Sequence, residues 1–138
     1  VEAARQEIPK TLCETCEYAS IDFYPLVISG NYDLAWELFT TLWNHHEELV
    51  EMTDIVLKNQ FPRGAGPLVA NMATYVGDYF YRQNEVGRAI SYYQKSTAID
   101  PQNESAWIGL YRSYRQRGMK YKVEEVRQRY RDIFGKPL

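Results

Sequence analysis

The sequence contains little cysteine and no long apolar segment. Among its 138 residues only Cys13 and Cys16 are cysteines, too few for a disulfide-stabilised scaffold. The uncharged stretch from Phe23 to Tyr32 is interrupted by Pro25 and Gly30 and has about half the length of a membrane span. The first residues also lack the apolar core of a signal peptide. We therefore expect a cytoplasmic protein without a membrane segment.

Charge is present in ordinary amount but is unevenly distributed. Residues 1–62 contain eleven acidic and three basic side chains, a charge of −8, whereas residues 104–138 contain nine basic and four acidic ones, a charge of +5. The 41 residues between them carry +1, which leaves a net charge of −2. Such asymmetry concerns association rather than fold. One interpretation is that copies of the chain form a homo-oligomer, acidic end against basic end; the alternative is that these are ordinary solvated helix faces.

The basic segment at residues 120–132 does not by itself indicate a nucleic-acid-binding protein. Acidic residues are interspersed with its basic ones, and the sequence pI is about 5.7, whereas nucleic-acid-binding domains are usually strongly basic. We expect no direct nucleic-acid contact. The basic residues of this segment are Lys120, Lys122, Arg127, Arg129 and Arg131, and the acidic ones are Glu124, Glu125 and Asp132.

A pattern with a period of 34 residues occupies the second half of the chain. Along one helix the pattern has a small residue, an apolar residue, a glycine and an aromatic residue. Along the next helix it has an alanine and an aromatic residue, and a proline follows that helix. The first copy is Ala73, Val76, Gly77, Phe80, Ala89, Tyr93 and Pro101, and the second keeps Trp107, Leu110 and Tyr114. Small residues let paired helices approach closely, aromatic residues fill the space between pairs, and such periods are typical of stacked helical repeats.

On these residues the chain resembles the tetratricopeptide repeat family over residues 70–137. The resemblance implies an all-α fold of about seven helices, with antiparallel helix pairs stacked as a short right-handed superhelix. The length of the chain predicts one helical domain over residues 1–138, with an irregular half at 1–62. The resemblance divides the second half into a repeat unit at 70–103 and a capping unit at 104–137. An Asn or Gln after Pro101 is expected to cap the first helix of the second unit.

The first half is a weaker copy of the same pattern. Gly30, Ala35 and Phe39 occupy the turn, small and aromatic positions, in a helix that follows one running back through Phe23 and Tyr18. A proline inside that first helix, Pro25, predicts a kink or a helix break. Leu49, Met52, Ile55 and Val56 predict a further helix over His45–Asn59, and Gln60–Pro67 is expected to be a loop.

No motif indicates an enzyme. Cys13 and Cys16 form one Cys-x2-Cys pair, but the second ligand pair that a zinc site needs is missing. His45 and His46 could supply two more ligands, but adjacent side chains on a helix point in different directions, so one ion can hardly bind both. The run Gly64-Ala65-Gly66 lacks the Lys of a phosphate loop. We therefore expect no catalytic residue, no metal site and no cofactor.

What remains is a binding surface for a protein or peptide. In stacked helical repeats the first helix of each pair lines a concave groove, and Tyr and Arg frequently carry the binding energy of interfaces. Some tetratricopeptide relatives grip a C-terminal carboxylate with Lys and Asn, but this chain places Thr74 and Asp78 there, so we do not expect that clamp. The predicted partner-binding residues are Asn71, Thr74, Asp78, Tyr81, Arg82, Ser105, Ile108, Arg112 and Arg115.

A narrower resemblance gives an alternative. The run from residue 70 to 138 is similar to the bacterial transcriptional activator domain, through the segments at 98–101, 103–104 and 110–115, Gly118, and the closing residues 134–137. That module is found beside a DNA-binding winged helix. The resemblance implies a regulatory or oligomerisation domain of a transcriptional regulator whose DNA-binding domain is absent from this fragment.

Overall fold

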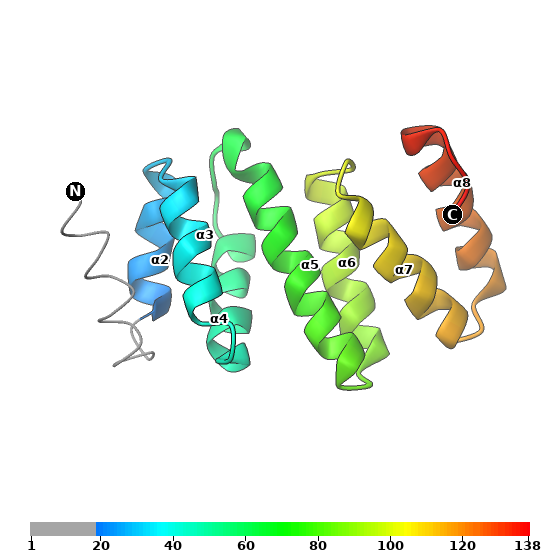
Figure 1. The fold of residues 1–138 in the computed structure, drawn as a ribbon, viewed down its shortest axis with the longest axis horizontal. Coiled ribbons are helices and arrows are strands. Elements are labelled where there is room, and N and C mark those ends of the chain that lie inside the picture. Colours follow the sequence, from blue (N-terminus) through cyan, green and yellow to red (C-terminus); the bar gives the residue numbers. More distant parts are fainter. Residues whose placement is uncertain (1–18) are drawn as a thin grey trace. The chain divides into compact units, whose positions relative to one another are not determined.

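The computed structural model describes residues 19–138, which form seven α-helices and one short 3-10 helix and contain no strand. Short connections join the helices in chain order (Figure 1). The predicted all-α fold with about seven helices is therefore confirmed for the described residues. The helices are α2 (Ala19–Ile28), α3 (Tyr32–Thr41), α4 (His46–Lys58), η2 (Arg63–Ala65), α5 (Gly66–Arg82), α6 (Val86–Ile99), α7 (Glu104–Gln116) and α8 (Lys120–Phe134).

The chain divides into two compact units, Val1–Leu68 and Val69–Leu138, with the boundary near the start of α5. In the described part of the first unit, α2 packs against both α3 and α4. The aromatic rings of Trp36, Phe39 and Trp43 contact one another along α3 and just beyond its end. The fully buried core of this unit includes Phe23, Val27, Leu38, Phe39, Leu42, Leu49, Met52 and Val56.

The expected helix break at Pro25 is absent, because Pro25 lies inside α2. The turns after it are closed by backbone bonds, with the Ser29 N–H donating to Pro25 O at 3.0 Å and the Asn31 N–H donating to Leu26 O at 2.9 Å. Phe23 and Val27, on either side of the proline, are at most 1% exposed. The burial of these two side chains offsets the cost of a proline in a helix, about 3 kcal/mol.

The segment predicted to be a loop, Gln60–Pro67, is partly helical. It contains η2, and α5 begins at Gly66, four residues before the expected start of the repeat unit at residue 70. Pro67 lies in the first turn of α5, where a helix has no use for a backbone N–H and the fixed φ of proline is favourable. Pro67, which was expected to lie in a loop, is therefore part of the first turn of α5.

The second unit contains two helical hairpins, α5–α6 and α7–α8. The turns within them carry Asn84 and Gly118, 34 residues apart, and both adopt a left-handed conformation with φ of 62° and 69°. The expected cap is Asn103, whose side chain accepts a hydrogen bond from the Ala106 N–H at 3.1 Å. Among the positions of the 34-residue pattern Pro101 is exposed, but most of the packing positions are at most 5% exposed, namely Ala73, Val76, Phe80, Ala89, Tyr93, Trp107, Leu110 and Tyr114.

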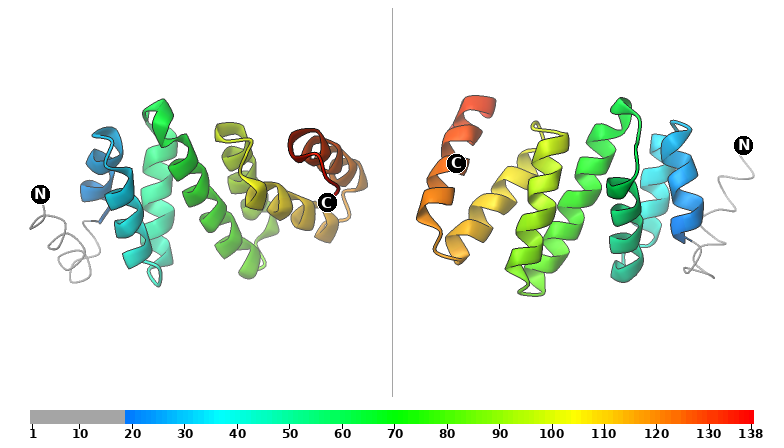
Figure 2. Two further views of the ribbon diagram at one scale, coloured as in Figure 1. Left: turned by 45° about the horizontal axis from the view of Figure 1, so that its top comes forward. Right: turned by 180° about the vertical axis from the view of Figure 1, so that it is seen from behind.

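The closing helix α8 is buried on one narrow side only. Its buried residues are Val126 and Tyr130, while most of the others are at least partly exposed. Helix α6 contacts α7 and is hydrogen-bonded to α5. The view from behind shows α6 alongside these two helices (Figure 2). Helix α7 in turn contacts α8, so α7 has neighbours on two sides.

Candidate functional site

A single tyrosine of α6, Tyr93, joins the first helices of the two hairpins. Its side chain is fully buried and contacts the backbone of α5 at Gly77 and of α7 at Gly109. A Cβ atom at Gly77 would lie 2.7 Å from the Tyr93 ring, and one at Gly109 would lie 2.5 Å from it. Both glycines are therefore required for α5 and α7 to approach this ring.

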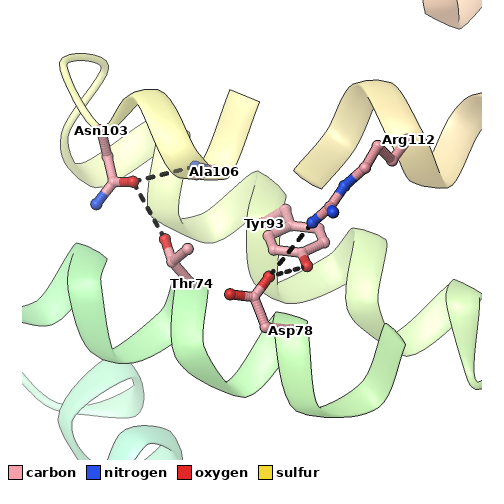
Figure 3. A network of polar contacts seen from close by, with 6 residues as sticks. All are labelled: Thr74, Asp78, Tyr93, Asn103, Ala106 and Arg112. Carbon is pink, nitrogen blue, oxygen red and sulfur yellow. Dashed lines mark hydrogen bonds and ion pairs between the residues drawn. The ribbon is translucent and has the colours of Figure 1, made fainter. Parts of the chain in front are cut away.

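The hydroxyl of Tyr93 belongs to a polar network at the surface (Figure 3). It donates a short hydrogen bond to Oδ1 of Asp78, and Nη2 of Arg112 lies 4.0 Å from the same oxygen. Burial, followed by the nearby Asp78 carboxylate, raises the pKa of Tyr93 well above its ordinary value. Tyr93 consequently remains a neutral donor at physiological pH and helps to fix the Asp78 carboxylate.

Arg112 is held in place but remains available. Its guanidinium lies 5.3 Å from the ring centre of Tyr81, and 52% of its side chain is exposed. A second pair on α7 has the same form, with the guanidinium of Arg115 lying 5.4 Å from the ring of Tyr111. Since a guanidinium has five N–H donors, an ion pair and a ring contact leave several of them for a partner.

The nine predicted binding residues do not all lie on the surface. Thr74 is only 6% exposed, and its hydroxyl donates to Ala70 O at 2.8 Å and lies 2.8 Å from Ser96 Oγ. It also lies 3.4 Å from Oδ1 of Asn103, so it ties α5 to α6 and to the start of α7. Thr74 therefore has a structural position and is not accessible to a partner, in contrast to the expectation from the sequence.

The other eight predicted residues are at least partly exposed. Asn71 also has a partner, since the Asn103 side-chain amide donates to its Oδ1 at 2.8 Å. Contacts of Arg112 with Asp78 and Tyr81 bring α5 and α7 residues together, and we call the resulting area the α5–α7 surface. Its centre is Asp78, Tyr81 and Arg112, which the contacts of Arg112 join. Helical spacing places the remaining members on the same sides of the two helices, Asn71 and Arg82 on α5, and Ser105, Ile108 and Arg115 on α7.

Sequence reasoning missed the role of Gly109. The 34-residue period makes Tyr111 the equivalent of Gly77. Gly109 lies two residues before that position, so the repeat pattern does not predict a close helix contact there. It also identified Tyr93 only as a packing residue. The signal that could have found the network is the polar tip of a tyrosine at a core position, which needs a hydrogen-bond partner when buried.

The segment after α8 is tied to the start of α7. The Tyr130 hydroxyl donates a short hydrogen bond to Oε2 of Glu104, and Nζ of Lys136 lies 3.2 Å from the same oxygen. The hydrogen bond from Tyr130 and the ammonium of Lys136 lower the pKa of Glu104, and the carboxylate in turn raises the pKa of Lys136. These three residues fasten the segment after α8 to the start of α7.

The candidate metal ligands give no site within the described part of the chain. Residues 19–138 contain no group of three His, Cys, Asp or Glu side chains placed to hold a metal ion. Cys13 and Cys16 lie outside the described residues. His45 precedes α4 as its N-cap residue and His46 is its first residue.

No family model matches the chain, and no curated protein is significantly similar to it in sequence. Among the helices of residues 19–138, none has the length and apolar character needed to cross a membrane.

Proposed function

We propose that the chain is a non-enzymatic, tetratricopeptide-like module that binds a protein or peptide partner through the α5–α7 surface. One observation carries this proposal, the placement of Arg112 between Asp78 and Tyr81. The side chain is half exposed and already oriented by a carboxylate at 4.0 Å and a ring at 5.3 Å. An oriented arginine loses less conformational entropy on binding than a free one, and arginine and tyrosine are enriched among residues that dominate binding energy.

The test compares partners captured by the wild-type chain and by surface variants. Tyr81→Ala and Arg112→Ala are expected to reduce capture of the partner, because they remove the ring and the cation that form the pair. Arg131→Ala is the matched control, since Arg131 is an exposed arginine on α8 outside this surface. If the two variants capture every partner of the wild-type chain in unchanged amount, the α5–α7 surface is not the binding site.

A second proposal follows from the narrower resemblance to the bacterial transcriptional activator domain. It is supported by the segments at 98–101 and 110–115 and by the closing residues 134–137. On this proposal the module regulates or oligomerises a transcription factor, and DNA is read by another domain. The full-length gene sequence tests it directly, because a winged-helix or receiver domain upstream would support it and an unrelated neighbour would contradict it.

A further inference from the structure

A concave site lies on another side of α7, away from the α5–α7 surface. It is a groove of about 290 Å³ between α6 and α8, with α7 as its floor. The floor consists of Trp107, Leu110 and Tyr114. From the geometry of an α-helix these residues point about 150° away from Ile108 and Arg112, so the two sets lie on nearly opposite sides of α7.

The α8 wall of this groove carries an arginine without a carboxylate partner. Within residues 19–138, no Asp or Glu oxygen lies within 4.0 Å of the Arg129 guanidinium. The guanidinium instead lies over the Trp107 ring, 5.2 Å from the ring centre. The neighbouring Lys122 is paired with Glu125 at 3.4 Å, but both side chains are more than 40% exposed. An exposed pair of this kind contributes little, so a ligand carboxylate can compete for Lys122.

The α6 wall supplies polar groups suited to a peptide. Gln94 and Thr97 line this side, and the Gln94 side-chain amide donates to the Tyr114 hydroxyl at 2.8 Å. The Tyr114 hydroxyl thereby accepts a hydrogen bond and keeps its own proton as a donor. Such a donor suits a peptide carbonyl, and the groove is at the small end of ligand pockets, which fits a short segment.

We propose that this groove, the α6–α8 groove, binds a short acidic peptide segment with one carboxylate on Arg129 and a second on Lys122. The argument is charge complementarity. Among the described residues, the α8 wall offers the Arg129 guanidinium without a carboxylate partner and the Lys122 ammonium weakly paired with Glu125, so these three side chains carry one net positive charge. Arginine favours a planar carboxylate because its N–H groups can bind both oxygens. The ring of Trp107 beneath the guanidinium holds it at the groove.

The spacing of the two cations predicts the spacing of the ligand carboxylates. Seven residues of α-helix separate Lys122 from Arg129, a rise of about 10 Å. In a polyproline II segment, side chains three positions apart lie on one side at about 9 Å. Glutamates three positions apart in an extended, proline-containing peptide therefore match the groove best.

The same geometry disfavours nucleic acid. Single-stranded nucleic acid binds by stacking bases on exposed aromatic rings along a basic channel. Here Trp107 and Tyr114 are each 4% exposed, and Glu125 interrupts the basic wall. Two separate carboxylates suit this wall better than a continuous row of phosphates.

The experiment measures fluorescence anisotropy of fluorescein-labelled, eight-residue Pro- and Leu-containing peptides with two glutamates at spacings from one to five. We expect saturable binding by the full chain, strongest at spacing three, weakened by added salt and absent when both glutamates are glutamine. Arg129→Ala is expected to weaken binding about tenfold or more, and Arg129→Lys to weaken it less, because lysine keeps the charge without the planar fork. Arg131→Ala, on the same helix outside the groove, is the control and should leave binding unchanged.

Three results would overturn the proposal. The first is the absence of saturable binding at every spacing, and the second is an equal loss in the Arg129→Ala and Arg131→Ala variants, which would indicate a general charge effect. The third is an Arg129-dependent contact made instead by a single-stranded oligonucleotide or by a second copy of the chain, detected by competition and by sedimentation at low salt. Tyr81→Ala should not change peptide binding, so failure of this site and failure of the α5–α7 surface are distinguishable.

Discussion

Replacing Gly109 by alanine tests the packing on which the candidate site depends. Two effects of opposite sign compete. Gly109 lies in the interior of α7, where alanine is favoured over glycine by about 1 kcal/mol. Against this, the new Cβ would lie 2.5 Å from two carbons of the Tyr93 ring and 2.8 Å from a third.

The steric cost should be the larger effect. The Tyr93 ring also contacts Gly77 of α5, and its hydroxyl is bonded to Asp78, so the ring cannot move freely. Overpacking of a core costs about 1–3 kcal/mol, and contacts this short with a constrained ring place Gly109→Ala near the upper end. After subtraction of the helix preference, we expect the free energy of unfolding to fall by about 2 kcal/mol.

Urea unfolding followed by circular dichroism measures this change, with Gly87→Ala as the control. A Cβ at Gly87 meets only Nη1 of Arg117 at 3.0 Å, the far end of a flexible side chain, so its effect should stay within about 0.5 kcal/mol. In a Tyr93→Leu background, Gly109→Ala should lose most of its cost, because the ring it meets is gone. A Gly109→Ala protein as stable as the wild type, or equally destabilised in both backgrounds, would refute the reasoning.

Two further predictions concern the hairpin turn and the end of the chain. Gly118→Ala should lower the free energy of unfolding by about 1 kcal/mol, since its φ of 69° is unfavourable for alanine, whereas Gly118→Asn should cost less because Asn84 adopts the same conformation in the other hairpin. For Glu104, a pKa lowered in the fold means that its stabilising contribution is present above the unfolded value of about 4.3 and is lost as pH falls through the folded value. Urea unfolding as a function of pH measures the difference in the free energy of unfolding between wild type and Glu104→Gln. This difference should be constant near neutrality and shrink below about pH 4. A difference that does not change on acidification would contradict the contact of Glu104 with Tyr130 and Lys136.

The sequence was sufficient for helix number and for the core of the second unit, for a physical reason. A 34-residue period places side chains of one size class at equivalent positions, and the residues from Ala73 to Tyr114 that follow it are buried, except for the exposed Pro101. The turn conformation shared by Asn84 and Gly118 follows the same period. At Pro25 the local rule was outweighed, because the burial of Phe23 and Val27 offsets the missing backbone donor.

The candidate site was harder to predict from the sequence. The position of a residue in the repeat indicates the direction of its side chain, but it does not identify the hydrogen-bond partners of that side chain. Thr74 and Asp78 are one helical turn apart on α5 and were expected to face the same partner. Ser96 and the start of α7 cover Thr74, however, whereas Asp78 meets Tyr93 and Arg112 at the surface. The difference arises from side chains of other helices, which no pattern along α5 contains.

Helix α7 shows why one short helix can serve two surfaces without conflict. Gly109 faces the Tyr93 ring, Arg112 extends over Tyr81, and Trp107 forms the floor of the α6–α8 groove. Because these directions are separated around the helix, a change at Arg112 alters the α5–α7 surface without touching the groove. A change at Gly109 displaces the Tyr93 ring, whose hydroxyl is bonded to Asp78, so it should disturb the α5–α7 surface as well as lower stability. The two proposed binding activities should therefore be separable by mutation at exposed residues, whereas a mutation in the core between the helices is expected to affect binding and stability together.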